Sequence, residues 1–146
     1  MPDNIHGTTI ILGELGILVT GASGSGKTTL ALALLGQFGR NRFSRIVGDD
    51  QLFIEGHAGR LICRAPQTIA GLAEVPGLGP RPLVHEPATL IDHVFRLVPP
   101  EEMSRFQDDA WLTIAGCRIP VVALRQRNVT AALPIIASRL AQAPFA

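Results

Sequence analysis

Cysteine is scarce in this sequence, and the spacing of the cysteines present excludes two classes of small protein. Cys63 and Cys117 are far apart and share no CxxC pattern, and the four histidines also lack metal-ligand spacing. A disulfide framework needs several bridged pairs, and a structural zinc site needs cysteines and histidines at short, regular spacings. We therefore expect two buried free thiols.

Charged residues are also few, at 17% of the chain, and the two signs nearly cancel. The 13 Lys and Arg residues stand against 12 Asp and Glu residues, which leaves a net charge of +1. Such a chain has no broad electrostatic field that would draw it onto nucleic acid or an anionic membrane, so we expect neither as a partner. Any site for an anion must therefore be local.

Long hydrophobic runs are missing too, although 47% of the residues are hydrophobic. No apolar run approaches the roughly 18 residues of a membrane-spanning helix, and no secretory signal pattern opens the chain. We expect a cytoplasmic protein. Because 146 residues are enough to bury one core, we expect a single globular domain over residues 1–146.

The order of the predicted elements is typical of an α/β domain with a mixed sheet and extra hairpins. Short glycine-bearing turns predict two hairpins, one near the N-terminus and one around residues 56–59. Three prolines and two glycines in residues 74–82 predict a constrained loop, and Pro134 is expected to kink the last helix. The expected strands are 8–12, 15–20, 44–48, 52–54, 61–63, 90–98, 111–115 and 119–124, and the expected helices are 28–37, 67–73, 101–106 and 128–142.

One glycine-rich motif is complete and lies between a predicted strand and a predicted helix. Its residues match the pattern G-x-x-x-x-G-K-[ST], in which glycines let backbone N–H groups turn around phosphates. Lys27 is expected to reach the β- and γ-phosphates, and the hydroxyl of Thr28 to bind Mg²⁺. The alternative is a glycine-rich turn with an exposed lysine, which the flanking strand and helix disfavour. The predicted nucleotide-binding residues are Gly21, Ala22, Ser23, Gly24, Ser25, Gly26, Lys27, Thr28 and Thr29.

Carboxylates are the next candidates, because phosphoryl transfer needs a metal anchor and a group that accepts a proton. Asp49 and Asp50 end a predicted strand, where adjacent residues point to opposite faces, so we expect different roles for them. Paired aspartates are also common as solvated turn residues or helix caps. Glu74, a single acid among apolar neighbours, is a candidate ligand for Mg²⁺.

Together these segments resemble the catalytic domain of HPr kinase/phosphorylase, a bacterial protein kinase, whose fold is related to that of phosphoenolpyruvate carboxykinase. The similarity covers most of the chain in order, and it is weaker in the second half. The matching segments are His6-Gly7, 21–28, Val47-Gly48-Asp49-Asp50-Gln51, Arg64-Ala65-Pro66 and 74–79, followed by Ser104-Arg105-Phe106, Ile119-Pro120 and Arg127-Asn128.

The resemblance implies an enzyme that uses ATP and Mg²⁺ to phosphorylate a serine of HPr, the small phosphocarrier of the sugar phosphotransferase system. The family also removes this phosphate by phosphorolysis, which yields pyrophosphate. By position, Lys27 would hold the phosphates, and Thr28 and Glu74 would bind Mg²⁺. Because the family assembles as hexamers, the resemblance also implies a homo-oligomer.

Four further residues take roles from the same resemblance. Asp50 would be the base that takes the serine proton and the acid in the reverse reaction, with Asp49 as the second choice. His6 would lie near this acid and tune its pKa through a hydrogen bond. Arg105 would clamp the charge that develops during transfer.

Several departures from the family bear on phosphorolysis and assembly more than on kinase activity. Where the family usually reads Glu-Ile-Arg-Gly-Leu-Gly, this chain has Pro76 in place of the arginine, and Gln126 replaces a glycine before Arg127. The chain resembles the short proteobacterial form that lacks the N-terminal domain, and the family's C-terminal helix is shortened after Arg139.

Two other functions stay open at the level of sequence. One is a P-loop kinase with a small-molecule acceptor, because the same fold resembles phosphoenolpyruvate carboxykinase. The other is an ATP-sensing regulatory module that transfers no phosphate, which Pro76 and the shortened tail favour. The kinase is preferred, since a pure binder has no need of the base Asp50.

Overall fold

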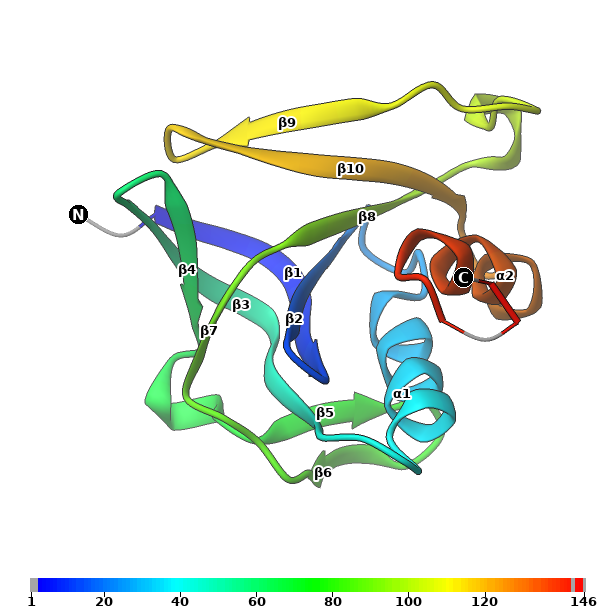
Figure 1. Cartoon of the computed structure of the whole chain (residues 1–146). Coiled ribbons are helices and arrows are strands. Elements are labelled where there is room, and N and C mark those ends of the chain that lie inside the picture. Colours follow the sequence, from blue (N-terminus) through cyan, green and yellow to red (C-terminus); the bar gives the residue numbers. More distant parts are fainter. Residues whose placement is uncertain (1–2, 143, 146) are drawn as a thin grey trace.

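A computed structural model describes residues 3–142 and 144–145 and shows one large sheet with two helices (Figure 1). Two further strands form a separate, smaller sheet. The strands are β1 (Asp3–Leu12), β2 (Leu15–Thr20), β3 (Ser44–His57), β4 (Arg60–Arg64), β5 (Leu72–Val75), β6 (Gly79–Pro82), β7 (Ala88–Leu90), β8 (His93–Val98), β9 (Ala110–Ile114) and β10 (Cys117–Arg125), and the helices are α1 (Lys27–Phe38) and α2 (Val129–Arg139).

The large sheet has eight strands in the order β7-β4-β3-β1-β2-β8-β10-β9. Its β2–β8 and β8–β10 pairs are parallel, and the other neighbours are antiparallel. The predicted α/β class with a mixed sheet is therefore confirmed. Both predicted hairpins are present as β1–β2 and β3–β4, and both strands of each pair are neighbours in the sheet.

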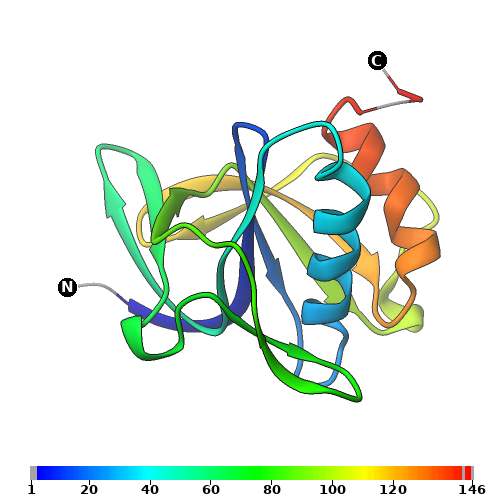
Figure 2. The same ribbon diagram turned by 90° about the horizontal axis from the view of Figure 1, so that it is seen from below.

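Apolar residues cover both faces of the central strands. Ile17 and Val19 point toward α1 and α2, which lie side by side on one face of the sheet (Figures 1 and 2), whereas Leu18 points into a second core. This alternation explains why β2 reads as a continuous apolar run, as buried strands do. The sheet curls so that Gly56 contacts the backbone at Ala115, and this closes the second core.

The predicted loop at residues 74–82 is wrong, because this segment forms the greater part of the hairpin of β5 and β6. Two prolines are tolerated because alternate residues of an antiparallel strand point their N–H groups to opposite sides. The N–H of Leu83 donates to the carbonyl of Gly71 at 2.7 Å. Because backbone nitrogens alternate in direction along a strand, the nitrogens of Pro80 and Pro82 point away from β5. Proline therefore removes no ladder hydrogen bond here.

Two predicted helices are wrong beyond a single turn of 3₁₀ helix each. The first stops at Ile69, since Gly71 adopts a φ of 75° and β5 begins at the next residue. The second covers Pro100–Glu102 alone, because the following residues find no apolar partner, and Phe106 is 83% exposed. In both places the helix propensity of the sequence is not sufficient by itself to extend the turn into a longer helix.

The predicted strand 90–98 is divided into β7 and β8 by Asp92. Its carboxylate accepts a hydrogen bond from the N–H of Gly16 at 2.8 Å, and its own N–H donates to the Gly16 carbonyl. Asp92 therefore fastens this segment to the start of β2 while the chain changes partner from β4 to β2.

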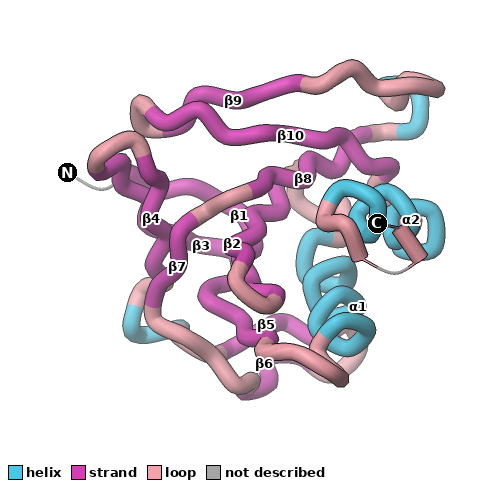
Figure 3. The backbone as a smooth tube through the Cα atoms, in the orientation of Figure 1, coloured by secondary structure: helices cyan, strands magenta, loops and turns pink. Residues whose placement is uncertain are grey.

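The two long predicted helices are confirmed with shifted ends (Figure 3). Helix α1 ends at Phe38 and is capped by Gly39, whose N–H donates to the Leu35 carbonyl. The side chain of Asn128 caps α2 by accepting from the Ala131 N–H at 3.0 Å. Pro134 lies inside α2 with its ring exposed. Over the described residues 3–142 and 144–145, neither helix is long and apolar enough to span a membrane.

Candidate active site

The glycine loop connects the end of β2 to the start of α1, as its sequence predicts. Gly24 and Gly26 have φ values of 77° and 94°, a region that L-residues rarely adopt, so glycine is needed at both positions. The N–H of Ser25 donates to the Ala22 carbonyl at 3.0 Å, and α1 begins directly after Gly26. The loop therefore leads directly into the N-terminus of α1, where free backbone N–H groups favour an anion.

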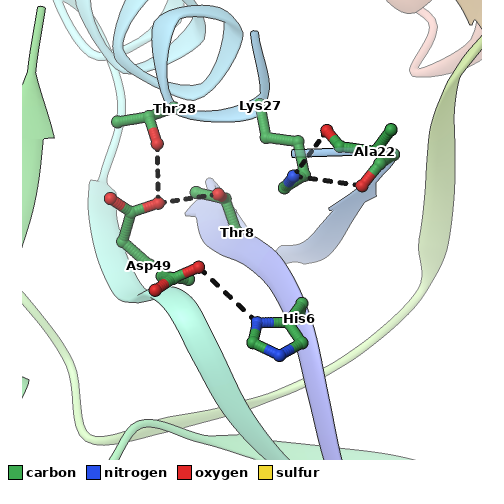
Figure 4. A network of polar contacts seen from close by, with 8 residues as sticks. His6, Thr8, Ala22, Lys27, Thr28 and Asp49 are labelled. Carbon is green, nitrogen blue, oxygen red and sulfur yellow. Dashed lines mark hydrogen bonds and ion pairs between the residues drawn. The ribbon is translucent and has the colours of Figure 1, made fainter. Parts of the chain in front are cut away.

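Lys27 extends back over this loop (Figure 4). Its Nζ donates to the carbonyls of Gly21 at 3.0 Å and Ala22 at 3.1 Å. The ammonium group is thus held at the mouth of the loop, which is where phosphate oxygens bind in proteins with this motif.

Arg127 supports the loop through two hydrogen bonds to its carbonyl groups. Its Nε donates to the Gly24 carbonyl at 2.8 Å, and its N–H donates to the Ser25 carbonyl at 3.1 Å. Arg127 itself has a φ of 53°. We did not predict this role, because the contact joins residues 103 positions apart and the resemblance at Arg127-Asn128 was the sole signal.

Asp49 is the acid that binds the motif to the sheet. Its carboxylate is 9% exposed and accepts hydrogen bonds from Thr8 Oγ1 and Thr28 Oγ1, each at 2.8 Å (Figure 4). It also accepts a hydrogen bond from the Glu74 N–H at 3.2 Å. These donors belong to β1, α1 and β5. Asp49 therefore orients the Thr28 hydroxyl and has little accepting capacity left.

Asp50 has the opposite environment. Its side chain is 79% exposed, and its Oδ1 lies 3.6 Å from Nδ1 of His6. Its φ of 73° is strained for a residue inside a strand, and such strain is concentrated at functional sites. The predicted alternation of the two aspartates is wrong, because this φ turns Asp50 into the same cavity as Asp49.

A cavity of about 880 Å³ collects most of the predicted site residues. The hairpin of β5 and β6 forms the wall opposite the glycine loop, below the start of α1 (Figure 2). Ala22 and Ser25 belong to the predicted loop but are not among the lining residues. The lining residues are His6, Gly21, Ser23, Gly24, Gly26, Lys27, Thr28, Thr29, Asp49, Asp50, Ile69, Leu72, Ala73, Glu74, Pro76 and Pro80.

Arg105 is a third predicted site residue that does not line this cavity. It lies exposed in the segment between β8 and β9, with its guanidinium 5.5 Å from the centre of the Phe106 ring. The structure thus brings together His6, the loop and the three acids, but leaves Arg105 apart.

The donors in this cavity suit a hard cation together with an anion. Three carboxylates line it, against the one ammonium group of Lys27, so a polyphosphate alone would meet like charge. Within the described part of the chain, no three His, Cys, Asp or Glu residues are grouped to hold a metal by themselves. Mg²⁺ needs no such group, because it takes one or two protein oxygens and completes its shell with water and phosphate. The Thr28 hydroxyl and the Glu74 carboxylate fit that need.

Two groups outside the cavity have a displaced pKa. Burial raises the pKa of the Cys63 thiol to about 11, although its hydrogen bond to Thr9 opposes this shift. Burial also lowers the pKa of His93, against the carboxylate of Asp92 and with the help of Arg139. Both cysteines are buried and free, as predicted.

The family model and the curated relatives that match this sequence all point to the same kind of protein. The family described as HPr Serine kinase C-terminal domain matches residues 2–80, which include His6, the loop and all three acids but not Arg105. HPr kinase/phosphorylase of Clostridium beijerinckii is 41% identical over 75 residues, and that of Clostridium tetani is 40% identical over 75 residues. These matches cover 51% of this chain and 23% of each relative.

The fold also matches a solved structure over nearly its whole length. The Hpr(Ser) kinase/phosphatase from Coxiella burnetii superposes with a TM-score of 0.80 and covers 94% of this chain and 95% of that one. At 20% sequence identity, this similarity shows a shared fold.

Proposed function

The chain belongs to the HPr serine kinase C-terminal domain family, and on that premise we propose that it is an ATP- and Mg²⁺-dependent protein kinase. Its acceptor is a serine hydroxyl of HPr or of an HPr-like phosphocarrier. Since the chain spans 23% of the length of the curated relatives that it matches, the proposal concerns the transfer reaction itself. An ATP-dependent kinase of this kind acts in the cytoplasm.

One observation carries the proposal: a phosphate loop and an exposed acid of distorted backbone line one cavity. The loop alone supports binding of a nucleotide, which a regulatory module would share. Asp50 adds a carboxylate that is open to an acceptor entering from solvent, and His6 lies 3.6 Å from it. This pairing supports transfer as well as binding.

In the proposed reaction, the loop N–H groups and Lys27 bind the β- and γ-phosphates of ATP. Lys27 exchanges its present bonds to the Gly21 and Ala22 carbonyls for bonds to phosphate oxygens. The Thr28 hydroxyl, oriented by Asp49, and the Glu74 carboxylate would hold Mg²⁺, which would supply positive charge against the phosphates. These residues position the γ-phosphoryl group toward Asp50.

Asp50 then accepts the proton of the serine hydroxyl as the serine oxygen bonds to the γ-phosphorus and the bond to ADP breaks. His6 keeps the carboxylate turned toward the acceptor. We assign this role to Asp50 rather than to Asp49, because Asp49 already accepts three hydrogen bonds and is buried. Proton acceptance of this kind contributes about 10²–10⁴-fold to a rate.

The test is a mixture of the protein, ATP, Mg²⁺ and HPr analysed by intact mass. A gain of one phosphate on HPr is expected with the wild type and not with Asp50→Asn. The proposal fails if no phosphocarrier gains mass while ATP binds normally. That result would favour the ATP-sensing module, which Pro76 in the cavity wall supports, or a small-molecule acceptor, which a screen of acceptors with labelled ATP would detect.

A further inference from the structure

A second and smaller cavity, of about 200 Å³, lies beside the phosphate loop at the start of α1 and α2. It shares Gly26 and Thr29 with the phosphate cavity, so the two meet where α1 begins. The rest of its lining comes from α1, β8, the last residue of β10, the segment that joins β10 to α2, and the start of α2. These residues are Leu30, Leu97, Arg125, Arg127, Asn128, Val129 and Ala132.

The chemistry of this second cavity contrasts with that of the first. Its walls combine four apolar side chains with two arginines, and none of its lining residues is acidic. Across residues 3–142 and 144–145, neither Arg125 nor Arg127 forms an ion pair with a carboxylate. The cavity thus offers apolar surface and unpaired guanidinium groups, which together suit a flat, electron-rich ring.

Arg127 is held in place for such a contact. The hydrogen bond from its Nε to the Gly24 carbonyl and the bond from its N–H to the Ser25 carbonyl tie it to the loop. An anchored guanidinium loses little side-chain entropy when a ring stacks on it. The residue that braces the phosphate loop therefore also lines the neighbouring cavity.

We propose that this second cavity holds the purine base of the nucleotide whose phosphates bind in the loop 21–28. This inference rests on the proposed nucleotide binding. In a nucleotide the base lies one sugar away from the phosphates, so its site must adjoin the loop, as this cavity does. The volume of about 200 Å³ is below the roughly 300 Å³ at which sites for whole ligands begin, and it therefore suits a ring system alone.

Two probes separate the base from the phosphates: ATP and inorganic tripolyphosphate, each with Mg²⁺, titrated by calorimetry. We expect the wild type to bind ATP more tightly. Val129→Phe fills the cavity from the half-buried first residue of α2. It should weaken ATP binding about tenfold, as loss of one stacking contact would, and leave tripolyphosphate within about twofold.

The matched control is Val84→Phe, the same substitution at a valine that is 68% exposed and lines neither cavity, and it should change neither affinity. Arg125→Ala is a second test at an exposed residue. It replaces Val129→Phe if the melting curve of that variant differs from the wild type and so shows a folding defect. It should also weaken ATP selectively, by a smaller factor.

The inference is overturned if the wild type binds both probes equally, or if folded Val129→Phe or Arg125→Ala loses affinity for both probes equally or for neither. In those cases the phosphate site still stands. If the wild type binds neither probe, the proposed nucleotide binding itself fails, and the base site fails with it.

Discussion

The two sides of the phosphate cavity are built in different ways. The loop side is made of consecutive residues, 21–29, whose shape follows from glycine φ values and from the start of a helix. The acidic side is assembled from β1, β3 and β5, which place His6, Asp49, Asp50 and Glu74 around the loop. The loop side is thus local, whereas the acidic side depends on strand pairing across the sheet.

This difference separates binding from reaction. In the proposed function, the loop side binds the phosphates and the acids take part in the reaction. The acidic side contains adjacent aspartates of which one is buried by three donors and the other is exposed and strained. Substitutions on the two sides should therefore change different quantities.

The largest effect is expected from Asp50→Asn, which removes the proton acceptor and keeps the shape of the side chain. The rate of phosphate transfer to HPr should fall about 10²–10⁴-fold, while ATP affinity changes little. Stability should stay within about 0.5 kcal/mol, because the residue is exposed and asparagine tolerates a φ of 73°. A steady-state assay measures the transfer rate, calorimetry measures the ATP affinity, and a melting curve measures the stability. An unchanged rate would remove Asp50 from the reaction.

Lys27→Ala on the loop side should reduce both ATP affinity and transfer. Removal of one charged donor from a phosphate site costs about 10²–10³-fold in rate. Tripolyphosphate should be lost together with ATP, because both depend on the same ammonium group. The control is Arg81→Ala, an exposed cation of β6 that does not line the cavity. Equal losses in both variants would show a general charge effect instead of a specific contact.

Asp49→Asn is the matched partner of Asp50→Asn and should act on stability. The amide group would place a donor where the carboxylate now accepts from Thr8, Thr28 and the Glu74 N–H. Leaving one buried donor unsatisfied costs about 1–3 kcal/mol, so denaturant unfolding should show this loss in Asp49→Asn and not in Asp50→Asn. Equal stability of the two variants would contradict the assigned difference.

Pro76→Arg tests the hairpin wall, where this chain departs from the family. The substitution returns a positive charge to a cavity with three carboxylates. We expect a few-fold faster phosphorolysis of phosphorylated HPr, because the inorganic phosphate that attacks the phosphoserine brings a second anion into this cavity. Pyrophosphate release checks this, with kinase activity as the internal control. A gain in the kinase reaction alone would show that Pro76 does not set the direction of the reaction.

The smallest effect concerns His93, outside both walls. Because burial lowers its pKa, the unfolded state binds the proton more readily, so stability should fall as the pH drops below about 6.5. His93→Gln should flatten this part of the stability curve, measured by urea unfolding between pH 7 and 5. His57→Gln changes an exposed histidine and leaves His93 in place, so its curve should keep the wild-type slope. If both curves flatten alike, His93 is not the cause.

Much of the fold could be predicted from the sequence, because its strongest signals are local. The apolar run 15–20, the alanine- and leucine-rich segment after the loop, and the glycine-bearing turns all appear where expected. The segment 74–82 could not be predicted, because proline excludes a residue from a central strand but not from the outer side of a hairpin. That outcome depends on which side of β6 pairs with β5.

Part of the candidate site could also be predicted from the sequence, because its signals are local. Lys27, Thr28 and Glu74 lie in one cavity, as the resemblance implied, although their roles stay proposals. The orientation of Asp50 and the bracing contact of Arg127 did not follow from sequence, because each depends on a positive φ that distant contacts impose.

The sequence by itself determined the phosphate loop, since glycine conformations and a helix N-terminus need no distant partner. It also determined the mixed α/β class through the order of its apolar runs. Only the tertiary structure decided that Asp49 is buried and Asp50 open, that β5 and β6 form the far wall, and that Arg127 holds the loop from behind. Each of these depends on contacts between residues far apart in the chain, which no local preference encodes.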